Sequence, residues 1–307
     1  MLPRRPRTRA VLALILAAAS WGIGVVISKR AVAEIPPLSL LPIQLGASLL
    51  ALTLLMRVRG IPLRDRSAAP ILGRLGLLNP GLAYALSLLG LVHITASLSV
   101  MLWALEPLLI VALAGLVLGE RIGPSLVVLS LVAVVGMALV IGRPEGAGSL
   151  VGVALTVAGV ACCAVYTVVA RRWLGTADGT APVVLSQQAH ALGLALAFVV
   201  GLWALGGAVR PVALTPAGLA SAIGSGVLYY GVAYWLYLSA LREVSASFAA
   251  ASFYLIPVFG VAGGFLLLGE RLDPTQLAGV ALVLVAVFAI LRGALRSPSI
   301  MASGHPL

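Results

Sequence analysis

Long apolar stretches with almost no charged residues recur along the whole chain, and they constrain its fold more than any other feature. About 20 apolar residues are enough for a helix to cross the hydrocarbon core of a bilayer. Uninterrupted runs of this length lack the alternation of a membrane β-barrel, so the backbone hydrogen bonds must close within helices. Only 9% of the residues are charged and 61% are hydrophobic, which excludes a soluble globular domain. The sequence therefore predicts an all-α integral membrane protein.

Ten of these stretches are predicted to be transmembrane helices. They cover residues 10–27, 37–56, 75–92, 95–118, 124–141, 150–170, 181–205, 217–240, 245–268 and 275–291. Ten spans require about 200 residues, which leaves no sizeable extramembrane domain in a chain of 307 residues.

The N-terminal segment resembles a signal peptide, because an arginine-rich prefix at residues 4–9 precedes an apolar run and the small residues 17–20. The apolar run continues to Ile27, however, and cleavage would leave an incomplete set of spans. We therefore expect this segment to be retained as the first helix. With the N-terminus in the cytoplasm, fifteen of the 20 Lys and Arg residues lie on the inner side, so the positive-inside rule places both termini there.

The chain contains an internal repeat with an offset of 150 residues. The offset aligns Gly, Ala, Tyr and Leu positions of residues 81–91 with those of 231–241, and it aligns the two Gly-Glu-Arg tripeptides at 119–121 and 269–271. Because five spans per repeat is an odd number, the two halves are predicted to insert with opposite topology. The predicted organisation is a first repeat at 1–145 including a cytoplasmic tail at 1–9, a second repeat at 146–296, and a short cytoplasmic tail at 297–307.

Ten spans, paired five-helix repeats and two Gly-Glu-Arg junctions make the chain similar to the EamA-type branch of the drug/metabolite transporter superfamily, from about residue 10 to residue 295. Members of that branch move amino acids, nucleotide-related metabolites, sugars and drugs, so the resemblance specifies architecture more than solute. It implies a secondary transporter in the bacterial plasma (inner) membrane that works by alternating access. Export of amino acids or related amphipathic solutes is the favoured activity.

Glu106 is the only carboxylate that the predicted spans place deep in the hydrocarbon. A charge there costs several kcal/mol unless it is paired, solvated or protonated. One hypothesis is that Glu106 couples protons or pairs with a substrate ammonium; the alternative is a hydrogen-bonded packing residue beside Pro107. Its repeat mate is Ile256, and this asymmetry favours a specialised role.

Aromatic residues accompany this carboxylate. Trp103 lies three residues before Glu106 on the same helical face, and its repeat mate is Phe253. Tyr84 and Tyr234 are also repeat mates. An aromatic wall beside a carboxylate suits an amine, an amino acid or a hydrophobic cation. Core packing is the alternative for Trp103 and Phe253, and helix-to-helix hydrogen bonding is the alternative for the tyrosines.

Asn79 precedes Pro80 in the third predicted span, where a polar side chain coincides with a weakened helix, as is typical near a substrate path. Tyr237, near the inner end of the eighth span, is interpreted as an interfacial anchor. The predicted substrate-binding residues are therefore Trp103, Glu106, Tyr84, Tyr234, Asn79 and Phe253.

Other polar residues receive structural interpretations. Gln187, Gln188 and His190 lie in the seventh span, where a neutral histidine hydrogen-bonded to a glutamine is favoured over a proton relay. Glu120 and Glu270 follow helix ends, where capping or ion pairing is favoured over gating.

The sequence contains no Gly-Lys-Ser/Thr phosphate loop, and Cys162 and Cys163 are adjacent within an apolar run. Neither a metal site, a cofactor nor a catalytic centre is predicted. The basic residues that produce the net charge of +11 lie between apolar runs. This placement indicates membrane topology instead of nucleic-acid binding. The expected partners are a small solute and membrane lipid, for a monomer or homodimer. A membrane-embedded enzyme acting on a lipid-linked substrate is the alternative function.

Overall fold

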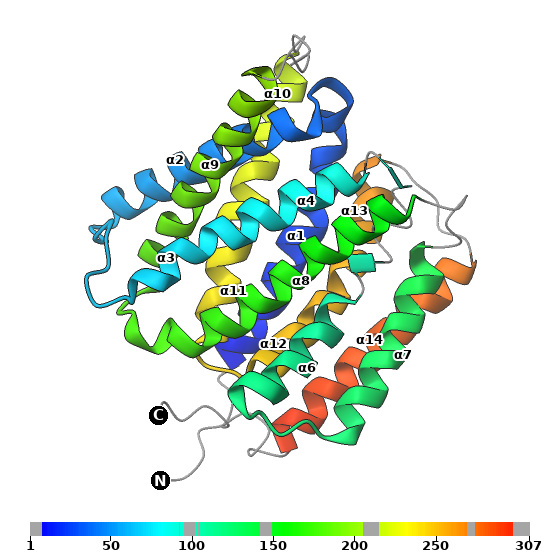
Figure 1. Ribbon diagram of the computed structural model, residues 1–307. Coiled ribbons are helices and arrows are strands. Elements are labelled where there is room, and N and C mark those ends of the chain that lie inside the picture. The colour runs from blue at the N-terminus through cyan, green and yellow to red at the C-terminus, as the bar shows by residue number, and fades with distance from the viewer. Residues whose placement is uncertain are drawn as a thin grey trace.

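The computed structural model describes residues 8–91, 93–94, 102–103, 105–141, 149–204, 215–268 and 274–296. Helices account for most of these residues (Figure 1). The α-helices are α1 Thr8–Glu34, α2 Pro37–Val58, α3 Pro70–Gly76, α4 Ala83–Leu91, α6 Glu106–Leu118, α7 Pro124–Ile141, α8 Leu150–Trp173, α9 Thr180–Ala204, α10 Pro216–Gly226, α11 Ala233–Leu241, α12 Ala246–Ala250, α13 Leu255–Leu268 and α14 Pro274–Arg296. Two π-helical turns, η1 Leu77–Leu82 and η3 Val227–Val232, and two 3₁₀ turns, η2 Leu174–Thr176 and η4 Ala251–Tyr254, complete the list.

Seven helical segments within the described part of the chain are long and apolar enough to cross a membrane. They are Thr8–Ser28, Leu38–Val58, Leu150–Thr176, Thr180–Ala204, Pro216–Leu241, Ala246–Leu266 and Pro274–Arg292. α6 and α7 are apolar but shorter, and the third predicted span corresponds to α3, η1 and α4 in succession. The protein is thus an all-helical, multi-pass membrane protein, while the number of ten spans stays a prediction.

Proline and glycine residues set several helix boundaries. Proline is the first residue of α2, α3, α7, α10 and α14, a position where its fixed φ suits the helix and its missing N–H costs nothing. At the other end of α6, Gly119 takes the left-handed conformation with φ 64°, which glycine adopts without steric cost. These local signals explain why the predicted start of α7 at residue 124 agrees with the structure.

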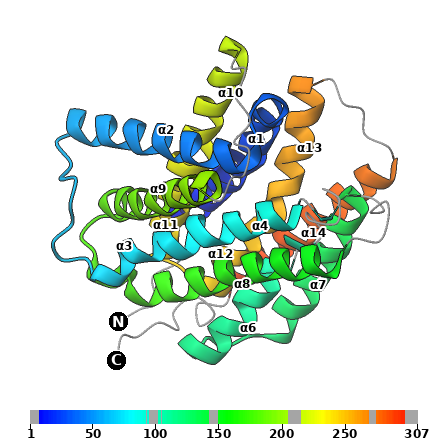
Figure 2. The ribbon, with the colours of Figure 1, turned by 45° about the horizontal axis from the view of Figure 1, so that its top comes forward.

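Helices of one half pack against helices of the other half, and these contacts come in matching pairs. α7 packs along α14, and α2 packs along α9, so equivalent helices of the two repeats meet (Figures 1 and 2). α4 packs on α8 while its repeat mate α11 packs on α1. Likewise, α6 packs on α8 while α13 packs on α1. This pattern agrees with the internal repeat that the 150-residue offset predicts.

Two glycines allow matching close approaches. Gly76 of α3 lies against the backbone of Gln187 in α9, and Gly226 of α10 lies against the backbone of Gln44 in α2. A Cβ atom at either glycine would collide with a backbone carbonyl oxygen. Since Gly76 and Gly226 are 150 residues apart, the same close crossing occurs once in each half.

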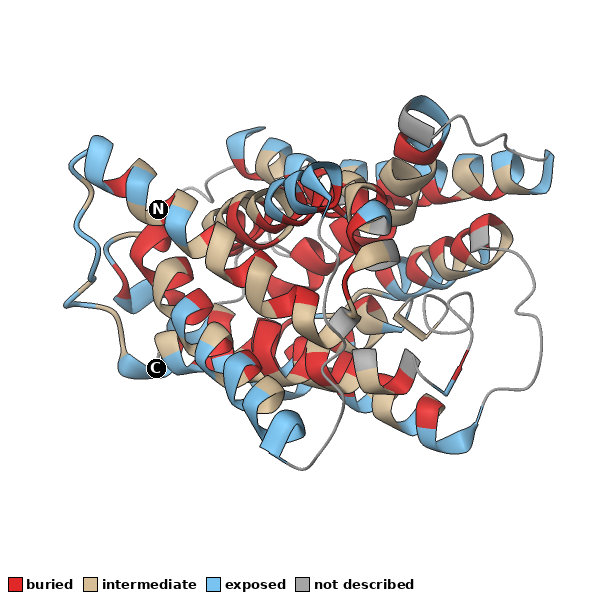
Figure 3. Cartoon of the chain, turned by 90° about the horizontal axis from the view of Figure 1, so that it is seen from above, coloured by how far each residue is buried: buried red, intermediate tan, exposed pale blue. Residues whose placement is uncertain are grey.

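Exposed residues lie along the outer faces of several helices (Figure 3). Many of these residues are large and apolar. Leu116, Leu266 and Phe288 are 84%, 76% and 63% exposed. Exposed apolar surface on this scale is typical of contact with another apolar phase, here lipid. The interior is also apolar, with a main cluster that joins residues of α1, α2, α8, α9 and α11.

The predicted repeat boundary at residues 145 and 146 falls between α7 and α8, outside the described residues, as do the two predicted tails except for residues 8 and 9. The boundaries of the two halves therefore stay predictions.

Candidate functional site

One cavity of about 350 Å³ is lined by residues of both halves of the chain. Its walls come from α1, η1, α4, α6 and α7 of the first half and from α8, η3, α11, η4 and α13 of the second half. All six residues predicted to bind substrate line this cavity: Asn79, Tyr84, Trp103, Glu106, Tyr234 and Phe253. Tertiary structure thus brings together side chains that are up to 174 positions apart in the sequence.

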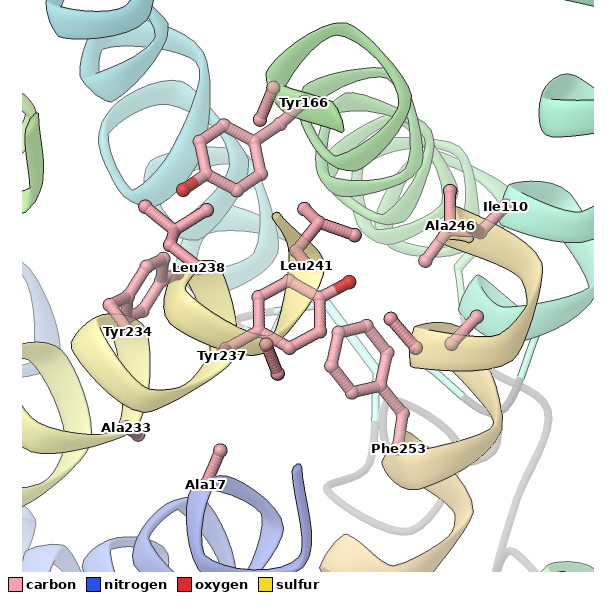
Figure 4. Packing of buried hydrophobic residues seen from close by; sticks show 14 of the residues in the cluster. Ala17, Ile110, Tyr166, Ala233, Tyr234, Tyr237, Leu238, Leu241, Ala246 and Phe253 are labelled. Carbon is pink, nitrogen blue, oxygen red and sulfur yellow. The ribbon is translucent and has the colours of Figure 1, made fainter. Parts of the chain in front are cut away.

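Aromatic rings form one wall of the cavity around Trp21 of α1. The indole packs edge-on against the rings of Tyr234, Tyr237 and Phe253, with ring centroids 5.4–5.6 Å apart. Figure 4 shows the rings of Tyr237 and Phe253 beside each other, and their centroids are 5.0 Å apart. The three edge-to-face contacts of Trp21 stabilise a fixed arrangement of rings, so this wall is preorganised.

A second aromatic group surrounds Tyr84 of α4. Its ring lies 5.6 Å from that of Trp103 and 5.8 Å from that of Tyr229. The hydroxyl groups of Tyr84 and Tyr229 are joined by a 2.6 Å hydrogen bond. The tyrosine and the tryptophan that were predicted from separate spans are therefore direct neighbours.

Glu106 is the first residue of α6 and lines the cavity. Most of the fourth predicted span before Glu106 lies outside the described residues, so the depth of Glu106 in that span stays a prediction. Within the described part of the chain, its carboxylate has neither a hydrogen-bond partner nor an ion-pair partner. The hydrogen-bonded packing role stays an alternative to the proposed functional role.

Asn79 interrupts the third predicted span. Its backbone is extended, with φ −145° and ψ 122°, since a following proline disfavours the α conformation. The side chain is buried, and its Oδ1 atom accepts a 2.9 Å hydrogen bond from the hydroxyl of Tyr234. The helix break predicted from Asn79-Pro80 is thus present, and it opens onto the cavity wall.

Tyr237 differs from its prediction. The sequence suggested an interfacial anchor, but the side chain is buried and its ring lines the cavity. Its hydroxyl donates a weak 3.4 Å hydrogen bond to Thr167 Oγ1. Packing of α11 against α1 places this face of the helix inward, which the position of Tyr237 near a helix end did not reveal.

The polar residues of α9 are occupied by structural hydrogen bonds. Gln187 accepts from the Tyr166 hydroxyl and donates to the carbonyl oxygen of Leu72. Gln188 donates to the carbonyl oxygen of Tyr230. His190 Nδ1 lies 2.7 Å from the carbonyl oxygen of Ser186, so its partner is a backbone group and not a glutamine.

Glu120 caps a helix that is distant in sequence. Its two carboxylate oxygens accept hydrogen bonds of 2.7 and 3.0 Å from the backbone N–H groups of Ala246 and Ser247 at the start of α12. A carboxylate at a helix N-terminus satisfies unpaired donors and complements the helix dipole. The helix-capping interpretation of Glu120 is confirmed, whereas Glu270 lies outside the described residues.

Sequence reasoning missed several residues of the cavity, above all Trp21, Tyr166 and Tyr229. Trp21 is the one aromatic residue between positions 8 and 34. A single large ring in a helix that is otherwise aliphatic and small was the available signal. The signal for Tyr229 was weaker: it is the neighbour of Tyr230 in an aromatic-rich segment.

Comparison with known families identifies this architecture. The model of the family described as "EamA-like transporter family" matches residues 8–142 and again residues 150–292. The chain belongs to this family. Because one family model matches each half, the comparison agrees with an internal repeat in this EamA-like chain.

Relatives of this EamA-like protein are named as transporters. An "Uncharacterized transporter" of Archaeoglobus fulgidus is 25% identical over 285 residues, 92% of this chain and 98% of the relative. The "Pseudopaline exporter CntI" of Pseudomonas aeruginosa strain UCBPP-PA14 is 29% identical over 282 residues, 92% of this chain and 95% of the relative. A "Probable terminal-alkyne amino-acid exporter" of Streptantibioticus cattleyicolor is 28% identical over 206 residues, 66% of each chain.

A solved crystal structure has the same fold, with a TM-score of 0.78 and 19% identity over 94% of this chain and 98% of that chain. Family membership and the named relatives together make this protein a transporter and not an enzyme. These findings exclude the alternative of a membrane-embedded enzyme.

Proposed function

We propose that this protein is a secondary transporter that exports a small metabolite, an amino acid or a related amphipathic solute, across the bacterial inner membrane. The observation that carries the proposal is one aromatic cavity, lined by both halves of the chain, that contains a carboxylate without a partner among the described residues. The names of the Pseudomonas and Streptantibioticus relatives, both exporters, support the direction and the solute class.

The proposed architecture has ten spans in two halves of opposite orientation, with both termini in the cytoplasm. Two features support it beyond the sequence. The π-helical turns η1 and η3 occupy residues 77–82 and 227–232, an offset of 150 residues. In addition, helices of each half pack against helices of the other half in matching pairs. In such a pair, rocking of one half against the other exposes a central site to each side in turn.

Glu106 is proposed to couple transport to protons or to pair with a substrate ammonium. A carboxylate in an apolar cavity is costly as an unpaired anion, so it favours either protonation or a cationic ligand. A proton and an ammonium group would then compete for the same position. Trp103, Tyr84, Tyr234, Phe253 and Asn79 are proposed to form the substrate-contacting wall around it.

Counterflow in proteoliposomes tests the proposal. Purified protein is reconstituted and exchange is measured for labelled amino acids, amines and nucleosides at two pH values. Saturable exchange of one class is expected, and exchange of none by correctly oriented protein would contradict a carrier of these solutes.

Two variants test the proposed role of Glu106. Glu106→Gln is expected to weaken exchange and remove its pH dependence, because the amide neither binds a proton in this range nor pairs with a cation. Glu243→Gln alters an exposed carboxylate after α11 and serves as the matched control. Unchanged transport and unchanged pH dependence in Glu106→Gln would exclude the coupling role.

A further inference from the structure

The formal charges around the cavity are unbalanced. Glu106 is the only Asp or Glu among the described lining residues, and none of those residues is Lys, Arg or His. A solute with one ammonium group neutralises this carboxylate. A zwitterionic amino acid also introduces its own carboxylate, which finds no cation here, and an unpaired buried charge is strongly disfavoured.

The tyrosine hydroxyls around the cavity already have partners. Tyr84 and Tyr229 bond to each other, Tyr234 donates to Asn79 Oδ1, and Tyr166 donates to Gln187 Oε1. Turning the Tyr234 or Tyr166 hydroxyl toward a solute carboxylate would break an existing hydrogen bond. The accepting hydroxyl of the Tyr84–Tyr229 pair keeps its own hydrogen, but a neutral hydroxyl supplies no positive charge. These groups therefore do not compensate for the missing cation.

Trp21 has an unused donor. Its side chain lines the cavity and is 5% exposed, and its Nε1 atom is buried without a hydrogen-bond partner. An indole N–H can only donate, so it requires an acceptor, and a buried donor left unpaired costs free energy. A neutral acceptor on the solute, such as an amide or ester carbonyl, satisfies this donor without adding charge.

A continuous series of rings connects Trp21 to Trp103, which lies three residues before Glu106 in the sequence. Successive ring centroids are 5.6 Å apart from Trp21 to Tyr234, 6.3 Å to Tyr230, 5.6 Å to Tyr84 and 5.6 Å to Trp103. Four members of this series, Trp21, Tyr234, Tyr84 and Trp103, line the cavity. An apolar or aromatic solute body can pack against these rings.

We propose that the cavity selects solutes of net charge +1 with three parts: an ammonium that pairs with Glu106, an apolar or aromatic body, and a neutral acceptor that bonds to the Trp21 indole N–H. The inference rests on the proposed transport function and narrows its solute class. The favoured solutes are amino compounds whose carboxyl group is masked as an amide or ester, in preference to free amino acids.

Binding and exchange of three matched compounds test the inference. Phenylalanine, phenylalanine amide and phenethylamine share an aromatic body and an amino group but differ in the second polar group. Calorimetric binding to reconstituted protein is expected to be at least about tenfold tighter for the amide than for phenylalanine, because only the zwitterion buries an unpaired carboxylate. Equal or tighter binding of phenylalanine, or binding of neither compound, would overturn the inference.

Counterflow of the same compounds separates the two proposals. Exchange of the amide in preference to phenylalanine supports both. Tight binding of the amide without any exchange leaves the charge selection standing and contradicts the transport function for this solute class. In Glu106→Gln, the preference for the amide over phenylalanine is expected to fall to within about twofold, since the charge that creates it is gone.

Trp21→Phe tests the neutral acceptor. The ring is retained while the N–H is lost, so binding of the amide is expected to weaken about 3- to 10-fold and that of phenethylamine to stay within about twofold. Trp103→Phe is the matched control in the same cavity, and it should affect the two compounds equally. An equal effect of Trp21→Phe on both compounds would exclude the hydrogen bond, and unchanged thermal unfolding confirms that the variant is folded.

Discussion

The hydroxyl of Tyr234 in α11 donates a 2.9 Å hydrogen bond to Oδ1 of Asn79 in η1. Both side chains are buried, and both line the cavity. Asn79 marks the helix break of the first half, and Tyr234 belongs to the equivalent region of the second half. The polar group at the break is thus satisfied by the opposite half of the protein.

Tyr234→Phe should lower the free energy of unfolding by about 1–2 kcal/mol, because it removes the donor and leaves a buried acceptor unpaired. Thermal unfolding of purified protein measures the change. Tyr237→Phe is the control on the same helix; its hydroxyl makes a longer 3.4 Å bond, so its loss should cost less. A larger destabilisation in Tyr237→Phe would show that the Asn79 bond contributes little.

Glu120→Gln should destabilise the protein by about 2 kcal/mol, since the amide retains one acceptor oxygen and loses the charge that strengthens both bonds to α12. Denaturant unfolding measures this cost, and Glu243→Gln, at an exposed position, provides the baseline. Equal stabilities of the two variants would argue against capping as a stabilising contact.

Asp65 joins two loops. Its Oδ1 atom accepts hydrogen bonds from Ser67 and Ala68, and its Oδ2 atom accepts from the backbone N–H groups of Asp178 and Gly179. Partial burial alone would raise the pKa of Asp65, but these bonds outweigh it and lower the pKa from 3.8 to about 2. The loop after α2 is therefore held to the loop before α9 by an ionised carboxylate.

The stabilisation from Asp65 should be complete above about pH 4 and should disappear as the pH falls toward 2, because a lowered folded-state pKa favours the folded state only when the group is ionised. Solvent screening limits the effect to about 1 kcal/mol. Thermal unfolding of wild type and Asp65→Asn across this range measures it. The two should converge at low pH, while Asp178→Asn, with an exposed side chain, should follow the wild type throughout.

Gly76→Ala and Gly226→Ala should each destabilise the protein by about 2–4 kcal/mol, because the new methyl group would collide with the backbone of Gln187 or Gln44. Gly224→Ala is the matched control in α10, where nothing lies within 4 Å of the added atom, and it should stabilise the helix by about 0.5–1 kcal/mol. Unfolding midpoints of the three variants measure these changes in stability. Tolerance of alanine at both positions would contradict the proposed close crossings.

Several parts of the cavity could be predicted from local pattern and repeat symmetry. Asn79 was identified because it precedes a proline, and Tyr84 and Tyr234 because they are repeat mates. Trp21 could not be assigned in this way, since its repeat position at Arg171 holds no aromatic partner. Tyr237 was misplaced for a similar reason: its depth depends on the packing of α11 against α1.

The sequence alone determined the membrane environment, the helical class, most helix boundaries and the internal repeat, because these depend on apolar length, proline position and self-similarity within short windows. Tertiary structure alone decided that Trp21 and Tyr237 line the same cavity as the six predicted residues, that the Glu106 carboxylate lacks a partner within the described residues, and that the helix capped by Glu120 is α12. These relationships depend on how distant helices cross, and packing between segments more than 100 residues apart leaves no signal in either segment by itself.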